Sequence, residues 1–209
     1  MKTQSGLNIT QFVCRVCDDI SKRLPQFSHI NTQRIAFSFS QTRNSREYGV
    51  FASVTPLRFE KGTTETVRRG KRWRIPPLKG ADGIDYLYIY RIYLPRLWDC
   101  SFETKLTTII HELLHISPNF DGDIRRFEGR CYAHGANQKN YDAYALALGE
   151  HWIQQNPPQE MLEILRLNTS ELIQRYGRIY GQRVTPPDLV RVDETLDERL
   201  ERLRKNLGF

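Results

Sequence analysis

Residues 109–123 read IIHELLHISPNFDGD, and this stretch decides how the rest of the chain is interpreted. It lies at the end of residues 101–116, where apolar side chains recur at helical spacing. Ser101 or Asp99 can cap the start of this helix, and Pro118 ends it. The sequence therefore predicts a helix that carries the pattern H-E-x-x-H near its C-terminal end.

The three polar residues of this pattern are His111, Glu112 and His115. Because positions i and i+4 share one face of a helix, both imidazoles can reach the same metal ion. Glu112 lies one step around the helix, beside the open position of such an ion, where it can accept a proton from bound water. Neutral imidazole nitrogens suit zinc in particular. The motif predicts a Zn²⁺ site with Glu112 as the catalytic base; the alternative is a helix whose histidines are ordinary, partly buried side chains.

A catalytic zinc site needs a third protein ligand, and several downstream residues are candidates. His134 stands just before Gly135, at the entrance to the next expected helix, and we favour it. Asp121, Glu128 and Glu150 are the alternatives. The ligand set from the residues alone is therefore open between these four.

An aspartate and two tyrosines near the start of that next helix are candidates for a supporting role at the site. Asp142 can accept a hydrogen bond from a ligand imidazole, although a solvated surface position is an equally good interpretation. Tyr141 and Tyr144 are three residues apart, which favours packing in the core.

Hydrophobic periodicity predicts the elements on both sides of the motif. An apolar stripe predicts an N-terminal helix over residues 10–24. Alternating, aromatic and β-branched residues predict three strands, the first two joined as a hairpin, at 33–40, 48–54 and 86–94. A long polar loop is expected at 60–84, and two more helices at 139–154 and 159–175. The order predicts an α+β fold: an N-terminal helix, a three-stranded sheet, the H-E-x-x-H helix, further helices and a C-terminal extension.

Composition and charge limit the classes of protein that fit. The chain has 209 residues, 39% hydrophobic and 26% charged, as a globular protein has. It contains no apolar stretch of membrane-spanning length and no signal-peptide pattern at its start, so no membrane partner is expected. Its four cysteines form no paired metal motif, which predicts free thiols and a cytoplasmic location.

The chain resembles the SprT-like zinc metallopeptidases, which are minimal zincins, and it is closely similar to the phage metallopeptidase family. The resemblance covers roughly residues 8–155 and is carried by HELLHISPNFDGDIRR at 111–126 and CYAHGANQKNYD at 131–142. In this family the H-E-x-x-H helix is followed by a downstream H-G and then an aromatic residue, here His134-Gly135 and Tyr141.

This resemblance implies a zincin-like fold and hydrolysis of peptide bonds in a protein or peptide substrate. It implies that His111, His115 and His134 hold Zn²⁺ and that Glu112 is the catalytic residue. It does not extend to the end of the chain, so we expect a zincin-like metallopeptidase domain over residues 1–157. A helical C-terminal extension over residues 158–209 is expected to pack on that domain.

Charge is concentrated in the first half of the chain. Residues 1–100 contain 17 Lys and Arg against 8 Asp and Glu, a net charge of +9, whereas residues 101–209 have a net charge of −2. Much of the excess lies in the loop at 58–79, whose candidate contacts are Arg68, Arg69, Lys71, Arg72, Trp73 and Arg74. Clustered cations attract phosphates and an exposed Trp can stack on a base, so the loop predicts contact with DNA or RNA. Alternatively, the loop binds acidic peptide substrates, or it is a solvated loop with no binding role.

These features leave a second function open. A catalytically silent, zinc-stabilised module that binds nucleic acid or regulates a partner, of phage or mobile-element origin, would use the same basic loop. The C-terminal stretch DETLDERLERLRKNL has leucines at helical spacing. It predicts a helix that packs on its own domain or, alternatively, pairs with a partner.

Overall fold

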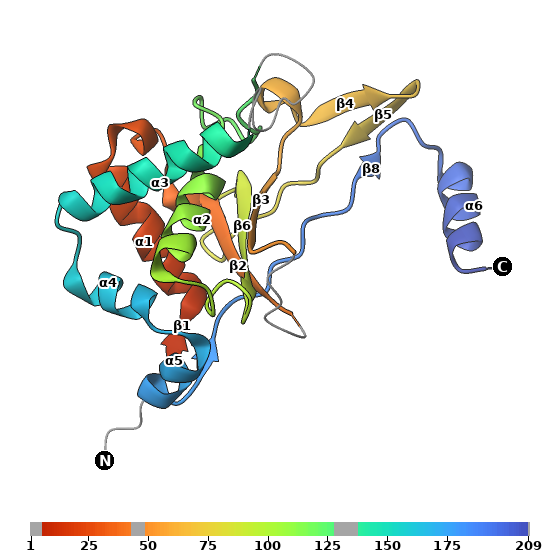
Figure 1. Ribbon diagram of the computed structural model, residues 1–209. Coiled ribbons are helices and arrows are strands. Elements are labelled where there is room, and N and C mark those ends of the chain that lie inside the picture. The colour runs from red at the N-terminus through yellow and green to blue at the C-terminus, as the bar shows by residue number, and fades with distance from the viewer. Residues whose placement is uncertain (1–5, 43–48, 128–137, 209) are drawn as a thin grey trace.

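A central sheet of three strands organises the protein (Figure 1). The computed structural model describes residues 6–42, 49–127 and 138–208. The strands of the sheet, in spatial order, are β2 (Ile35–Gln41), β6 (Tyr88–Leu94) and β3 (Ala52–Pro56). β2 runs parallel to β6, and β3 runs antiparallel to it. The described residues therefore form the expected α+β architecture.

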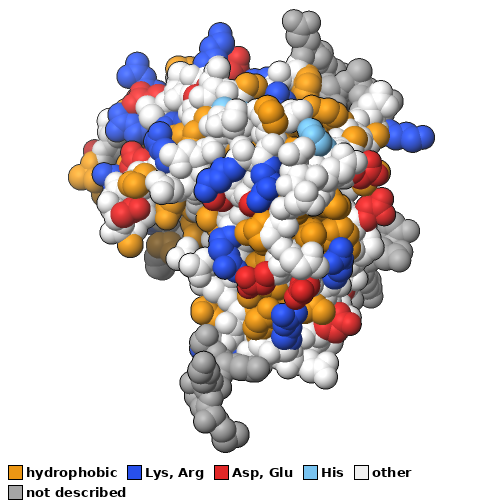
Figure 2. Space-filling model, turned by 90° about the vertical axis from the view of Figure 1, so that its left-hand side faces the viewer, with side chains coloured by type: hydrophobic (Ala, Val, Ile, Leu, Met, Phe, Trp, Pro, Cys, Tyr) orange, Lys and Arg blue, Asp and Glu red, His pale blue; other side chains and the backbone are white. Residues whose placement is uncertain are grey.

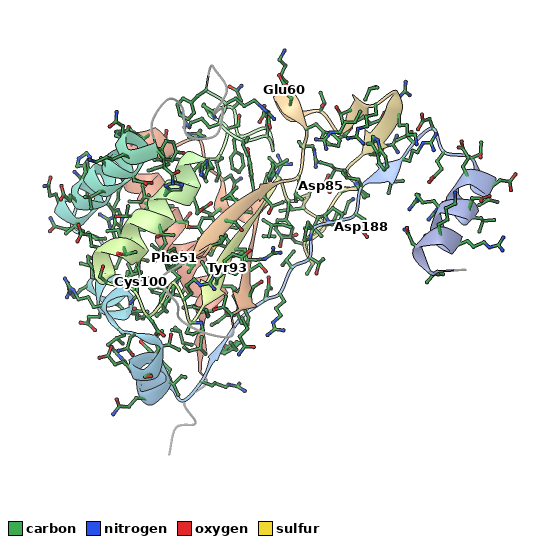
Figure 3. All side chains as sticks on the ribbon, turned by 45° about the vertical axis from the view of Figure 1, so that its right-hand side comes forward. Phe51, Glu60, Asp85, Tyr93, Cys100 and Asp188 are labelled. Carbon is green, nitrogen blue, oxygen red and sulfur yellow. The ribbon has the colours of Figure 1, made fainter. Side chains whose placement is uncertain are left out.

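The predicted hairpin between the first two strands is wrong, because β6 lies between β2 and β3. The Tyr93 amide donates to the Phe51 carbonyl at 2.9 Å, and the two labelled residues lie side by side in Figure 3. The sequence of β6, YIYRIYL, is aromatic and β-branched, and most of its side chains are buried. A strand that is buried on both faces belongs at the centre of a sheet, which hydrophobic periodicity alone does not reveal.

Helices cover one face of this sheet. α1 (Ile9–Arg23) packs against β2, and α2 (Phe102–Leu114) packs against β3. α3 (Gln138–Gln154) lies on α2 (Figure 1). The face of the sheet that these helices cover shares one hydrophobic core with them.

The contact between α2 and α3 depends on a glycine. A Cβ atom at Gly149 of α3 would lie 3.2 Å from Leu106 Cγ of α2, closer than most carbon contacts allow. Ala145, one turn earlier, is fully buried. Small residues on this face of α3 therefore let the two helix backbones approach closely.

The predicted helix over residues 159–175 is two helices, α4 (Gln159–Arg166) and α5 (Thr169–Tyr176). Asn168 separates them because its side chain accepts a hydrogen bond from the Glu171 amide, while the Glu171 carboxylate accepts one from the Asn168 amide. This capping box starts a new helix where periodicity alone predicts continuation. Both helices contribute to the main core, through Leu162, Leu165 and Leu172 among others.

The chain after α5 runs along the side of the central sheet that lies opposite to the helices. β7 (Ile179–Tyr180) pairs in parallel with β1 (Leu7–Asn8). The Phe39 amide then donates to the Gln182 carbonyl at 3.0 Å, and the Val184 amide donates to Ser38 Oγ at 2.9 Å. The tail thus forms a strap across β2.

The expected loop at 60–84 contains a β-hairpin that the pattern did not indicate. β4 (Glu65–Arg68) and β5 (Lys71–Arg74) are joined by Arg69 and Gly70, both with positive φ. Two such residues form the tight turn that matches the twist of a hairpin. β8 (Val190–Arg191), from the C-terminal tail, adds a third strand beside β5. Charged residues lie on both faces of the hairpin, so its sequence lacks the alternation of apolar and polar residues that predicts a strand. β8 is far along the chain from β5, so no local sequence pattern predicts that the two strands pair.

α6 (Leu196–Asn206) follows β8. It is the last element of an arm, formed by β8 and α6, that projects from the rest of the molecule (Figure 1). Asp188 lies on the segment that leads into this arm (Figure 3). α6 has no buried residue, so the packing expected for the whole of residues 158–209 does not extend to this helix. Among the helices described, none has both the length and the apolar character needed to span a membrane.

The buried side chain of Lys105 connects α2 to α4 through hydrogen bonds. Its side chain is 1% exposed, and Nζ donates to the Leu165 and Leu167 carbonyls at 3.1 and 2.7 Å. These carbonyls lie at the C-terminal end of α4, where a cation also interacts favourably with the helix dipole. One side chain thus donates to two backbone acceptors at the end of a helix.

We expect Lys105→Met to lower the free energy of unfolding by about 1 to 3 kcal/mol, because it leaves these buried acceptors without their donor. Urea unfolding followed by circular dichroism measures the change. Lys22→Met is the matched control: Lys22 is exposed on α1 and pairs with Asp18 one turn away, so the unfolding midpoint of this variant should stay close to that of the wild type. Equal midpoints for the two variants would contradict the role of Lys105.

Candidate metal centre

α2 presents His111, Glu112 and His115 together at its C-terminal end. One potential ligand atom from each of the three residues lies within 4.8 Å of the others. The two imidazole rings have centroids 4.9 Å apart, as the i and i+4 positions of one helix face require. Both histidines are half-buried and Glu112 is buried. Among the described residues, this is the group whose donors could hold a metal ion.

Asp142 of α3 orients His111. The His111 Nδ1 atom lies 2.8 Å from Asp142 Oδ1, and a carboxylate in this position accepts, so Nδ1 carries the proton. The lone pair is then on Nε2, the nitrogen that can bind a metal. A carboxylate behind a ligand imidazole fixes both its tautomer and its orientation. Asp142 therefore accepts a hydrogen bond from the His111 imidazole although its own side chain is 47% exposed.

Tyr141 packs against both imidazoles. Its ring stacks on His115, with centroids 5.4 Å apart and planes at 23°, and meets the edge of His111 at 4.9 Å. Burial holds the pKa of the Tyr141 hydroxyl well above its usual range, so the side chain is a neutral phenol. Tyr144 is 49% exposed, so the predicted core packing of the pair is wrong for this residue. Tyr141 is buried in the main core, as predicted, and its ring also packs against the two imidazoles.

The environment of Glu112 disfavours its charged form. Burial raises the pKa of its carboxyl group to about 7, and a hydrogen bond from the Val54 backbone opposes this rise. The same hydrogen bond links the end of α2 to β3. A carboxyl group that lies beside two imidazoles and is held by a strand amide has a fixed position from which to exchange a proton.

A cleft of about 1020 Å³ opens over the three residues. Residues 49–54, which lead into and form most of β3, make one wall. The described charged residues that line it are acidic or histidine: Glu103, His111, Glu112, His115 and Asp142. The described lining contains no Lys or Arg, so its electrostatic character favours neutral or basic ligands over acidic ones.

β3 is an edge strand beside this cleft. The hydrogen bond between Tyr93 and Phe51 shows that alternate residues from Phe51 onward direct their backbone groups toward β6. Ala52 and Val54, between them, direct theirs away from β6, and the Val54 amide accordingly meets Glu112. The cleft wall thus presents backbone donors and acceptors of an extended strand.

The third ligand is not fixed by the described residues. His134 and Glu128 lie outside them. Asp121 and Glu150 are described, and neither belongs to the group that could hold a metal. The Asp121 carboxylate instead accepts from the Asp123 amide at 3.1 Å, within the loop after α2.

The rest of that loop has a structural role. The Asp123 carboxylate forms two hydrogen bonds to the Arg126 guanidinium, both at 2.9 Å, and accepts from the Lys61 amide at 3.1 Å. The Tyr88 hydroxyl donates to the Asp123 carbonyl at 2.8 Å. These hydrogen bonds hold the loop that follows His115. A structural role within this loop therefore explains both Asp121 and Asp123.

The candidate basic contacts lie apart from this centre, on the sheet of β4, β5 and β8 (Figure 1). Arg74 and Arg72 pair with Glu65 on the neighbouring strand. The exposed cations Arg68, Arg69 and Lys71 gather at the tip of the hairpin, whereas Trp73 is half-buried where β5 meets β8. On the side of the molecule that faces left in Figure 1, by contrast, basic and acidic side chains are interspersed (Figure 2). The basic segment is thus a β-hairpin rather than the expected polar loop, and none of its residues lines the cleft.

Comparison of the chain with protein-family models, with curated proteins and with solved structures found no match.

If the group holds a metal ion, we expect Asp142→Ala to weaken its affinity for added Zn²⁺ by about 10- to 100-fold, because His111 loses the acceptor that fixes its tautomer. Competition with a chromophoric chelator measures the affinity. Glu150→Ala is the matched control, since it removes another carboxylate from α3 at an exposed position outside the metal-binding group. A loss of affinity in the control, or none in Asp142→Ala, would contradict this role.

Proposed function

We propose that the protein is a zinc-dependent metallopeptidase that hydrolyses peptide bonds of a protein substrate. The observation that carries the proposal is the grouping of His111, Glu112 and His115 in a cleft walled by an edge strand. The resemblance of the H-E-x-x-H segment to SprT-like metallopeptidases supports the same conclusion.

The donors suit zinc. Two imidazoles lie on one helix face and one of them is oriented by a carboxylate, so they would supply two of the three protein ligands that a catalytic zinc site needs. His134 is the proposed third ligand, on the strength of the family resemblance. Other divalent metals also bind imidazole, so the metal content of the purified protein decides the identity.

Each residue has a role in the proposed reaction. His111, His115 and His134 would hold the ion, which supplies an activated water molecule and polarises the substrate carbonyl. Glu112 is placed to take the proton of the attacking water and to return it to the leaving nitrogen. Asp142 and Tyr141 keep the two imidazoles in place through the contacts described above.

The wall of the cleft favours an extended peptide as the substrate. The backbone groups of Ala52 face away from β6, so a substrate segment can pair with β3 as an added strand. Such pairing would hold the peptide across the end of α2, next to Glu112. The acidic lining favours peptides with neutral or basic residues near the scissile bond.

The thiols favour a cytoplasmic location. Cys14 and Cys17 are free thiols, and burial raises the pKa of Cys14 to about 11 and holds that of Cys17 well above its usual range. Cysteines kept as unreactive thiols are typical of proteins in reducing compartments. We therefore propose that the protein acts in the cytoplasm of a bacterial or phage-infected cell.

We expect Glu112→Gln to lower peptide hydrolysis by at least about 100-fold while zinc remains bound, because Gln keeps the shape and the acceptor for Val54 but cannot take a proton. Dye-labelled casein and a set of fluorogenic peptides with basic residues are the substrates. Glu103→Gln makes the same change elsewhere on α2 in the cleft lining and should retain activity.

Zinc content is the second measurement on these proteins. The wild type should hold about one zinc per chain, and His134→Ala should lose most of it, whereas His151→Ala on α3 should not. Hydrolysis retained by Glu112→Gln, or a wild type that binds no zinc even when zinc is supplied, would refute the proposed function.

A second candidate function is nucleic-acid binding through the hairpin. The observation in its favour is the gathering of Arg68, Arg69 and Lys71 at an exposed tip. If catalysis is absent, a zinc-stabilised module that binds nucleic acid, of phage or mobile-element origin, is the alternative that we propose. The two functions are also compatible, since the hairpin lies apart from the cleft.

We expect the double variant Arg68→Ala and Lys71→Ala to weaken binding to single-stranded DNA and to reduce the slope of log affinity against log salt by about 1.4, which is about 0.7 for each lost phosphate contact. Fluorescence anisotropy at several salt concentrations measures both quantities. Arg15→Ala with Lys22→Ala removes the same charge from α1 and should leave the slope unchanged. Equal effects of the two double variants would show that only net charge matters.

A further inference from the structure

α6 has an apolar face that none of the described residues of its own chain buries. Its leucines are 70%, 56% and 42% exposed at Leu196, Leu200 and Leu203, and Leu207, directly after the helix, is 72% exposed. The spacing of the four residues is four, three and four. These are the a and d positions of a heptad repeat, which place all four side chains on one seam.

A helix of this length needs a partner surface. α6 has 11 residues, and isolated helices shorter than about 12 to 15 residues are marginal in water. A capping box at Thr195 and Glu198 starts the helix, and Arg202 holds Glu194 with two hydrogen bonds, at 2.9 and 3.0 Å. These polar contacts stabilise the first turns but leave the leucine seam in water. Packing of that seam would supply the missing stabilisation.

We propose that α6 pairs with α6 of a second copy of this chain, and that the two helices run antiparallel. In this arrangement Leu200 packs against Leu203 of the second copy, and Leu196 packs against Leu207 of the second copy. Each seam covers the other, so the interface is two-fold symmetric and closes as a dimer.

The charges beside the seam select the antiparallel direction. With the leucines at a and d, Asp197 and Arg204 occupy e positions and Arg199 occupies a g position. An antiparallel pair brings e next to e, so Asp197 meets Arg204 of the second copy, twice by symmetry. A parallel pair brings g next to e, so Arg199 would meet Arg204 of the second copy, and both contacts would be repulsive. The helix dipoles also favour the antiparallel direction.

The position of α6 makes a second copy the natural occupant. The helix stands at the end of the arm, away from the sheet and from α1 to α5 (Figure 1). Arg191 of β8 lies 3.6 Å from Glu198, an ion pair that fixes the start of the helix relative to the hairpin. The leucine seam of another copy matches this face in length, apolar character and charge order, because it is the same surface.

The test is the oligomeric state of the full chain by sedimentation velocity, from about 1 to about 200 μM. We expect a monomer–dimer equilibrium in this range. Leu200→Asp with Leu203→Asp should be monomeric throughout. The control Ile173→Asp places the same charge at an exposed apolar residue on α5 and should keep the dimer. A monomeric wild type at the highest concentration, or a dimer in the double variant, would overturn the proposal.

Charge reversal tests the direction of pairing. Arg204→Glu faces Asp197 of the second copy in the antiparallel pair and should raise the dimer dissociation constant about tenfold. In a parallel pair the same change would relieve the repulsion with Arg199 and tighten the dimer, which would overturn the antiparallel assignment. Lys205→Glu makes an equal charge change at an outward position and should have a smaller effect. Adding Asp197→Lys to Arg204→Glu should restore the pairing.

Discussion

The close packing of α3 on α2 is the constraint on which the candidate centre depends. Asp142, Ala145 and Gly149 recur at i, i+3 and i+7, so they share the face of α3 that looks toward α2. The two small residues allow the backbones to approach, with no room for a Cβ atom at Gly149 unless Leu106 moves. That approach carries the Asp142 carboxylate to His111 Nδ1 and places the preceding Tyr141 ring against both imidazoles. A wider separation of the helices would leave the histidines as two side chains on a helix surface, without an orienting partner.

The other sides of α2 are fixed as firmly, and each contact comes from a different part of the chain. The Tyr90 hydroxyl of β6 donates to the Ile109 carbonyl at 3.1 Å, directly behind the motif. The Val54 amide of β3 meets Glu112, and Lys105 holds the start of α2 to the end of α4. The helix is therefore held by sheet and helices along its length, and its remaining stripe faces the cleft. Functional groups on a rigid element keep the geometry that a reaction at a metal requires.

Local chemistry and periodicity predicted the α+β architecture, the helix that carries the motif, and the grouping of His111 with Glu112 and His115. These features depend on residues within a few turns of one another. The strand order β2-β6-β3 depends instead on which strand buries both faces, and the strand β8 pairs with β5 more than a hundred residues away. The division between α4 and α5 follows from one Asn168 side chain inside an apolar pattern. The third ligand stays a prediction, because His134 lies outside the described residues.

The C-terminal tail joins two features that the sequence presents separately. Beyond the strap on β2, the Val192 amide donates to the Arg72 carbonyl at 2.9 Å, and the Arg72 amide donates to Asp193 Oδ1 at 3.3 Å. The basic hairpin is thus held by the segment that continues into α6. Association of two copies through α6 would therefore also bring two hairpins into one assembly. Two linked cationic surfaces bind a polyanion more tightly than one, because the second contact forms at a high effective concentration. If the hairpin binds nucleic acid as proposed, the arm would then couple the oligomeric state to that affinity.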